Sequence, residues 1–427
     1  MSARPSPKEK PVSPAWPYLT AEMPAVPARF KQRGEDFVVE EVPLYHPCGE
    51  GDHTYVAIEK EGLTTRRAVL DIARALGVPP SSIGVAGQKD ARGIARQLLS
   101  VERVEPSRIR SLALPGIRIL DVARHRTKLR VGWLRGNRFA VRLREVPTTC
   151  VGEVRAVLDL LARRGVPNYF GAQRFGMRGD TWEVGRSLLA GDFASAEASI
   201  VGRPLEGDPV PVRRARELAA ARRYREAAAA WPREYADCAR LCRALEAADG
   251  DPRRAIFRLD RSALSLYVSA YQAWLFNRVL ARRVPGIDRL LPGDIAVCHR
   301  SGLCSLVLDT ASEEPRAGRF EISPTGPMVG FAMSKPEGEA GVVEATILAD
   351  AGCSPDALPR SGPLACVGGR RPLRFRAEEL GAECGTDAFG PYLELRFALP
   401  PGSYATALLR EICKGELRET FADQVDA

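Results

Sequence analysis

The sequence predicts an α+β protein, because segments with the two-residue period of strands alternate along it with segments of helical period. Its 427 residues exceed the usual size of one domain, so we expect two. The composition changes after the first part of the chain, and residues 212–247 are rich in Ala, Arg and Glu. Strands separated by helices, together with amphipathic hairpins, favour a sheet covered by helices on one face.

The first elements are two short strands within residues 29–60, around a loop rich in Pro and Gly. A helix follows, capped at its start by Thr64 or Thr65 and ended by Gly77 before two prolines. The apolar stripe of this helix consists of Ala68, Val69, Ile72, Ala73 and Leu76.

A short apolar strand is expected at Ile83–Ala86, and extended structure resumes at Ala95–Val101. The loop between them contains the stretch KDARG. Asp90 therefore lies on a glycine-flanked loop that two strands hold in place.

Residues 126–144 alternate in two runs and predict a hairpin with LRGN as its turn. A helix at 150–165 closes the first part of the chain. In the second part, 261–283 predicts a helix whose stripe, including Tyr267 and Tyr271, is expected to be core. Strand character returns at 390–412, which we expect to complete the first sheet.

The positive charge is concentrated in one segment. Net charge is +9, and residues 102–145 hold twelve Lys or Arg against four Asp or Glu. Such an excess favours a polyanion such as nucleic acid, although a solvated arginine-rich face explains it equally well before motifs are considered. The residues expected on a nucleic-acid backbone are Arg126, Lys128, Arg130 and Arg138.

Several classes of protein are disfavoured. The ten cysteines form no C-x-x-C pair and only four histidines accompany them, so we expect reduced thiols and no metal site. The longest run without a charged residue, 262–277, is too short and too polar to cross a membrane. The first 20 residues contain five prolines and no apolar run, which predicts a disordered tail over 1–24 and a cytoplasmic protein.

The familiar catalytic signatures are missing from the sequence. No Lys follows a Gly as in a phosphate-binding loop, and neither H-E-x-x-H nor G-x-S-x-G occurs. Asp90 taken alone is most simply a solvated turn residue, since Asp side chains bond to nearby backbone N–H groups in turns.

Seven segments in order resemble the TruD family of tRNA pseudouridine synthases. They are FKQRGEDFVVEE, AGQKDARGIARQ, RGNRF, VPNYFGAQRFG, SAYQAWLFNRVLARR, PTGPMVG and LPPGSYATALLREI. Gly34, Gly93 and Ala95 depart from the usual residues of the family, and none of the three is a proposed catalytic side chain.

The resemblance implies isomerisation of a uridine in tRNA, typically position 13, to pseudouridine, without cofactor or metal. It also implies a pseudouridine-synthase catalytic domain with a mixed, mainly antiparallel sheet, interrupted by an α/β TRUD domain, with RNA bound between them. The expected parts are the tail 1–24, catalytic residues 25–165, the insertion 166–368 and the return segment 369–427. We expect a monomer.

The resemblance assigns the catalytic carboxylate to Asp90 and its neighbouring cation to Lys31. Whether Asp90 attacks C1′, adds to the ring or removes a proton from C2′ stays open, and each route needs the ionised form. The uridine must leave its stack to reach Asp90. We therefore expect an aromatic ring that stacks on the flipped base and polar side chains that form hydrogen bonds with it. These substrate-binding candidates are Phe139, Asn137, Lys89 and Gln97.

Alternation alone favours plain core for Phe139, and the resemblance reverses that preference. Lys89 is next to Asp90, but neighbours on an extended loop usually point apart. In the segment VPNYFGAQRFG, the resemblance gives Asn168, Phe170, Gln173 and Arg174 a supporting role behind the RNA-binding cleft.

Two other functions remain open. One is an RNA-binding protein that uses the same basic surface without turnover, and the other is an acid/base hydrolase of nucleosides, which requires a second catalytic acid. Retention of Lys31, Asp90, Asn137 and Phe139 favours the enzyme, since binding alone has no need of a carboxylate among phosphates.

Overall fold

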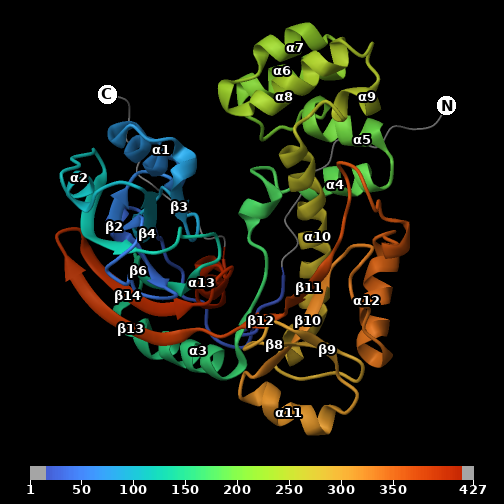
Figure 1. The fold of residues 1–427 in the computed structure, drawn as a ribbon. Helices are drawn as coiled ribbons and strands as arrows, with labels where there is room; N and C mark the ends of the chain where they lie inside the picture. Colours follow the sequence, from blue (N-terminus) through green and yellow to red (C-terminus); the bar gives the residue numbers. More distant parts are fainter. Residues whose placement is uncertain (1–15, 416–427) are drawn as a thin grey trace. The chain divides into compact units, whose positions relative to one another are not determined.

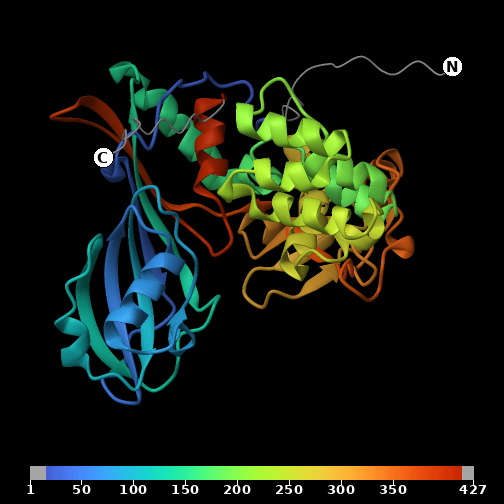
Figure 2. The same ribbon diagram turned by 90° about the horizontal axis from the view of Figure 1, so that it is seen from above.

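A computed structural model describes residues 16–415 and divides the chain into two compact units. Among the described residues, the sheet unit comprises Tyr18–Pro167 and 374–415, and the inserted unit comprises Asn168–Leu373 with Trp16 and Pro17. Figures 1 and 2 show the elements of each unit. The chain therefore leaves the sheet unit at Pro167 and re-enters it at Arg374.

The sheet unit is built on an eight-stranded sheet in the order β13-β14-β6-β1-β4-β2-β5, with β3 beside β4. β1 and β4 pair in parallel, and the other neighbours in this sheet pair antiparallel. The predicted α+β class with a mixed, mainly antiparallel sheet is thus confirmed. The strands are β1 Phe37–Pro43, β2 His53–Glu61, β3 Ile83–Val85, β4 Ile94–Glu102, β5 Ile117–His125, β6 Leu134–Arg144, β13 Glu378–Asp387 and β14 Gly390–Leu399.

Helices cover one face of this sheet. Helix α1 (Thr65–Leu76) packs on β2 and β4, and α3 (Val151–Arg164) and α13 (Ala405–Cys413) pack on β1, β6 and β14. We call this the helix-covered face; in Figure 2 helix α1 lies across the strands. The opposite face carries charged side chains such as Glu59 and Arg96.

The local signals of helix α1 are confirmed. The Thr64 side chain accepts a hydrogen bond from the Arg67 N–H at 3.1 Å, and Gly77 ends the helix with φ of 69°. A residue with a Cβ atom is strained in that left-handed conformation, which explains the glycine.

The predicted hairpin at 126–144 is wrong. Residues 134–144 form one continuous strand, β6, so the LRGN stretch lies inside a strand, and residues 126–133 form a loop. A Cβ atom on Gly136 would lie 2.4 Å from the backbone oxygen of Leu399. This glycine therefore marks a close approach of two strands and not a turn.

Part of the predicted tail 1–24 makes tertiary contacts. Residues 1–15 lie outside the described residues, but residues 16–24 are held in place. Thr20 is buried, and its N–H donates to the Glu411 carboxylate at 3.0 Å while its hydroxyl donates to the Glu411 carbonyl oxygen at 2.7 Å. A tertiary contact with a segment 391 positions away thus orders a stretch that local composition made look disordered.

The inserted unit combines helices with a four-stranded sheet in the order β11-β10-β8-β9. The stripe on α10 is core as predicted, since Leu264, Val268 and Tyr271 belong to one buried cluster. Its main helices are α4 Thr181–Leu189, α5 Phe193–Glu197, α6 Val210–Ala220, α7 Tyr224–Ala230, α8 Ala236–Glu246, α9 Pro252–Ile256, α10 Arg261–Arg283, α11 Thr310–Gly318 and α12 Gly338–Asp350, and its strands are β8 Ile295–Cys298, β9 Cys304–Leu306, β10 Ile322–Met328 and β11 Gly369–Pro372. Within residues 16–415, no helix is long and apolar enough to cross a membrane.

We expect Gly136→Ala to destabilise the sheet unit by about 1–3 kcal/mol, because its Cβ atom meets backbone that has no room to move. Thermal unfolding measures the effect. Gly152→Ala is the matched control, since a Cβ atom there meets nothing within 4 Å. Equal melting temperatures of the two variants would contradict the close approach.

Candidate active site

The candidate site lies within the loop between β3 and β4, on residues 87–93, which we call the Asp90 loop. Asp90 Oδ2 lies 2.9 Å from Lys31 Nζ, although the two residues are 59 positions apart. Asp90 precedes β4 and Lys31 precedes β1, and these strands are parallel neighbours. Because parallel strands place their beginnings at the same edge of a sheet, the two side chains meet there.

The environment of Asp90 keeps its side chain ionised. Burial alone raises the pKa of this carboxyl group, but the hydrogen bond and charge of Lys31 and the N–H groups of Ala91 and Arg92 outweigh burial. The net result is a pKa below the ordinary value of 3.8. Asp90 is therefore an anion at neutral pH, with 45% of its side chain exposed to a ligand.

Lys31 is held in an unusual backbone conformation. Its φ is 55°, in the left-handed region that residues with a Cβ atom rarely adopt. Its side chain is 4% exposed, and its Nζ lies 4.4 Å from the centre of the Phe37 ring. Such strain persists only where packing enforces it, and here it directs the ammonium group at Asp90.

Lys89 has a different partner from Asp90. Its Nζ lies 2.6 Å from Oε2 of Glu41, and both side chains are buried. The two neighbouring side chains of the loop thus point apart, as expected. As a substrate-binding candidate Lys89 is weakened, because its ammonium group is already engaged with Glu41.

Gln97 and Asn137 lie on either side of Glu41 on the helix-covered face. Glu41 on β1 is the register partner of Asn137 on β6. Glu40 on β1 is the partner of Arg96 on the parallel strand β4, so the next residue of β4, Gln97, lies beside Glu41. Gln97 Oε1 accepts from the Thr65 hydroxyl at 2.8 Å, which leaves its Nε2 without a partner in the described residues. Asn137 Oδ1 is likewise buried and unpaired there, so a donor and an acceptor remain for a ligand.

Phe139 is half-buried on the same face of β6 as Asn137. Its ring centre lies 5.2 Å from that of Phe397 and 5.9 Å from that of Phe37, the ring beneath Lys31. Phe139 therefore belongs both to the core and to the margin of the Lys31–Asp90 site.

Sequence reasoning missed Lys60 and Glu41. Lys60 Nζ donates to the backbone oxygen of Asp90 at 2.7 Å, and burial lowers its pKa to about 8. The signal was present in the alternation: Lys60 continues the inward row of Val56 and Ile58 on a strand. A charged residue in an inward row indicates a functional or paired group.

The residues of the NYFG motif lie in the inserted unit and support its own structure. Asn168 Nδ2 donates to the Pro372 carbonyl at 2.8 Å, and Asn277 brackets the backbone of Phe170 with bonds of 2.9 and 3.0 Å. Arg174 lies 5.5 Å from the centre of the Phe170 ring, and Gln173 is exposed.

The four arginines and lysines expected on an RNA backbone do not gather at Asp90. Arg126 pairs with Glu50 and Lys128 donates to the Ser81 carbonyl, on a loop whose Leu129 packs against Tyr55. Tyr55 points to the face opposite Gln97. Arg130 lies 5.5 Å over the Trp133 ring, and Arg138 pairs with Glu379 on the charged face of β6.

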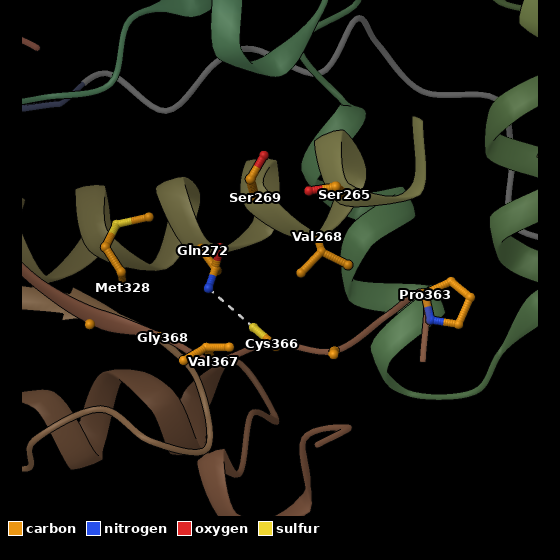
Figure 3. Close-up of a pocket in the computed structure, with 11 residues that line it drawn as sticks. Ser265, Val268, Ser269, Gln272, Met328, Pro363, Cys366, Val367 and Gly368 are labelled. Carbon is orange, nitrogen blue, oxygen red and sulfur yellow. Dashed lines mark hydrogen bonds between the residues drawn. The ribbon is translucent and has the colours of Figure 1, made fainter. Parts of the chain in front are cut away.

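A separate pocket of about 370 Å³ lies in the inserted unit and is shown in Figure 3. Its wall includes Gln272, which donates to the Cys366 sulfur at 3.1 Å. Burial raises the pKa of that thiol to about 11, so it is a poor nucleophile at neutral pH. The remaining lining is hydroxyl, apolar or backbone, and the pocket therefore lacks the groups of the Lys31–Asp90 site.

Between residues 16 and 415, no group of three or more His, Cys, Asp or Glu side chains is arranged to hold a metal ion.

Comparison with known proteins gives a consistent result. The family model TruD, tRNA pseudouridine synthase D, matches residues 15–412. A tRNA pseudouridine synthase D of Geobacter sulfurreducens is 47% identical over 402 residues, covering 93% of this chain and 96% of the relative. One from Anaeromyxobacter dehalogenans strain 2CP-1 is 36% identical, covering 94% and 97%. A crystal structure from Methanosarcina mazei described as TruD superposes with a TM-score of 0.80 at 26% identity, covering 93% and 96%.

We expect Lys31→Met to raise the pKa of the Asp90 carboxyl group by about one to three pH units, because the hydrogen bond and charge of Lys31 are the largest of the effects that lower it. Carbon NMR of labelled aspartate carboxylates, followed against pH, measures it. Lys335→Met, which removes an exposed partner of Asp356, is the control and should leave Asp90 unchanged. An unaltered Asp90 titration in Lys31→Met would contradict the assigned cause.

Proposed function

Because this chain belongs to the TruD family of tRNA pseudouridine synthases, we propose that its target is uridine 13 of tRNA and that Asp90 is the catalytic carboxylate. The protein is an isomerase that converts uridine in tRNA to pseudouridine. The observation that carries the proposal is the 2.9 Å pair of Lys31 and a half-exposed Asp90.

The reaction places modest demands on the protein. The C1′–N1 bond of the uridine breaks, a C1′–C5 bond forms, the C5 proton is lost and N1 gains a proton. Nothing is oxidised or reduced, so a cofactor and a metal are unnecessary. An ionised carboxylate beside the sugar serves as nucleophile or base, and Lys31 keeps Asp90 in that form.

The uridine reaches Asp90 by leaving its stack, which costs a few kcal/mol that the pocket must return. Phe139 offers a ring at the margin of the site. The unpaired acceptor of Asn137 and donor of Gln97 match the N3–H and a carbonyl oxygen of uracil. These two amides support recognition of uracil over cytosine, which presents an acceptor at N3.

We further propose that the sheet unit is the catalytic domain, that the inserted unit is the TRUD domain, and that the protein acts as a cytoplasmic monomer. Asn168, Phe170, Gln173 and Arg174 have a structural role in this proposal. The alternative is RNA binding without turnover. The low pKa of Asp90 favours the enzyme. An anion in an RNA-binding site repels phosphates and weakens binding, so its presence is explained by a role in the reaction and not by binding.

We expect Asp90→Ala to reduce pseudouridine formation at least about 100-fold while tRNA binding is kept, because the carboxylate acts in the reaction and repels phosphates in the ground state. Tritium release from C5-labelled uridine in unmodified tRNA measures turnover. Asp356→Ala, at an exposed aspartate of the inserted unit, is the matched control. Wild-type protein that binds tRNA but releases no tritium would establish the binding-protein alternative, and a transcript with cytidine at position 13 tests the position.

We expect the double reversal Arg126→Glu with Arg130→Glu to flatten the salt dependence of tRNA affinity, since each lost phosphate contact lowers the log–log slope by about 0.7–0.9. The matched control is the double reversal Arg223→Glu with Arg319→Glu, at two exposed arginines of the inserted unit that are not proposed to contact RNA. Titrations of labelled tRNA at increasing salt measure the slopes. Identical slopes for all variants would exclude loop 126–133 from RNA contact.

A further inference from the structure

We propose that Lys60 is a positioning residue for the reaction, which holds the main chain of the Asp90 loop and adds a positive charge beside the catalytic carboxylate. The inference rests on the proposed role of Asp90. It concerns a residue on β2 whose ammonium group reaches the loop from the helix-covered face.

Lys60 joins the Asp90 loop to the start of helix α1. Its Nζ donates to the backbone oxygen of Asp90 at 2.7 Å and to the backbone oxygen of Leu63 at 2.5 Å. Leu63 directly precedes the capping residue of α1, so the two carbonyl groups belong to the loop and to the helix start. The residue is 1% exposed, which fixes the ammonium group in one place.

A second contact holds the same loop at the preceding residue. The Lys89 N–H donates to the Thr65 hydroxyl at 2.8 Å, and that hydroxyl donates to Gln97 Oε1 at 2.8 Å. Thr65 holds the loop at Lys89 and Lys60 holds it at Asp90, both from the start of α1 or the strand before it. The direction of the Asp90 carboxylate therefore depends on these two anchors.

Burying the positive charge of Lys60 destabilises the folded state. The hydrogen bonds to two backbone oxygens do not by themselves explain why a charged residue stands at this position. Two other buried cations of the sheet unit are paired with carboxylates: Lys89 with Glu41, and Arg144 with Asp36. Among the described residues Lys60 forms no ion pair, and its ammonium group is held by carbonyl oxygens. A buried charge without a counter-ion in contact indicates a functional requirement, because a neutral donor would serve a purely structural anchor.

The charge also gives the site a pH dependence. Burial lowers the pKa of Lys60 to about 8, with Lys89 adding to the lowering and Asp90 opposing it. Asp90 and Lys89 face Lys60 from the Asp90 loop. Each has an ion-pair partner of its own, Lys31 for Asp90 and Glu41 for Lys89. Above this pH the amine still donates to two oxygens but the positive charge beside Asp90 is lost.

The sign for stability is opposite to that of an ordinary ion pair. Because the folded-state pKa lies below the ordinary value of 10.5, the unfolded chain binds more protons between these two values. Folding stability from Lys60 therefore rises with pH in that window and is lowest at neutral pH. Removing the positive charge should therefore remove its destabilising effect on the folded state and at the same time slow the reaction. A lysine with only a structural role would not combine these two effects.

The test compares Lys60→Met, which keeps the length of the side chain, with Lys60→Arg, which keeps the charge, in tritium release from tRNA between about pH 6 and pH 10. For Lys60→Met we expect kcat to fall about 100-fold with KM within about threefold of wild type. We expect wild-type kcat to fall above about pH 8, this fall to vanish in Lys60→Met, and it to move to higher pH in Lys60→Arg. Lys335→Met is the control for loss of a lysine.

Hydrogen–deuterium exchange of residues 87–93 gives a second measurement that does not need turnover. We expect faster exchange in Lys60→Met and unchanged exchange in Lys335→Met. Wild-type kcat and loop exchange that persist in Lys60→Met would overturn the inference, as would a large loss of melting temperature with an unchanged pH profile. If wild-type protein makes no pseudouridine, the proposed function fails, while exchange in the loop still decides whether Lys60 anchors it.

Discussion

The candidate site depends on keeping one partly buried carboxylate ionised. Burial works against the charge of Asp90, and the Lys31 ammonium group at 2.9 Å more than offsets it. The arrangement needs a cation that is itself sheltered from water, because an exposed ion pair is screened and weak. Lys31 meets this need through its packing on Phe37 and a strained backbone, and these features concentrate where the chemistry is proposed.

The topology of the sheet brings this pair together. β1 and β4 are parallel neighbours in a sheet whose other neighbouring strands are antiparallel, and Lys31 and Asp90 precede these two strands. Parallel pairing sets both segments at one edge, while the antiparallel neighbours β2 and β6 bring Lys60 and Asn137 to the same face. The side chains of Gln97, Glu41 and Asn137 form a row across the strands on this face. Polar groups on three strands thus share one site because the side-chain period is two on each.

Sequence signals within a single segment correctly predicted elements that depend on that segment alone, such as helices. The cap at Thr64 and the left-handed Gly77 bound helix α1 as expected, and the apolar row of α10 is core. The hairpin prediction was wrong because a glycine in an alternating segment marks either a turn or a close strand, and only the partner strand β14 decides between them. Thr20 was placed in a disordered tail because nothing near it in sequence reveals its bond to Glu411.

The sequence by itself determined the fold class, the family resemblance and the choice of Asp90 and Lys31 as candidates. Motifs and their order along the chain can be recognised without knowing which residues are in contact. The tertiary structure decided which lysine does what. Lys89 is adjacent to Asp90 in the chain yet binds Glu41, whereas Lys60, 30 positions away, holds the Asp90 backbone. Strand pairing sets these distances, and pairing partners lie too far apart along the chain for local propensity to specify them.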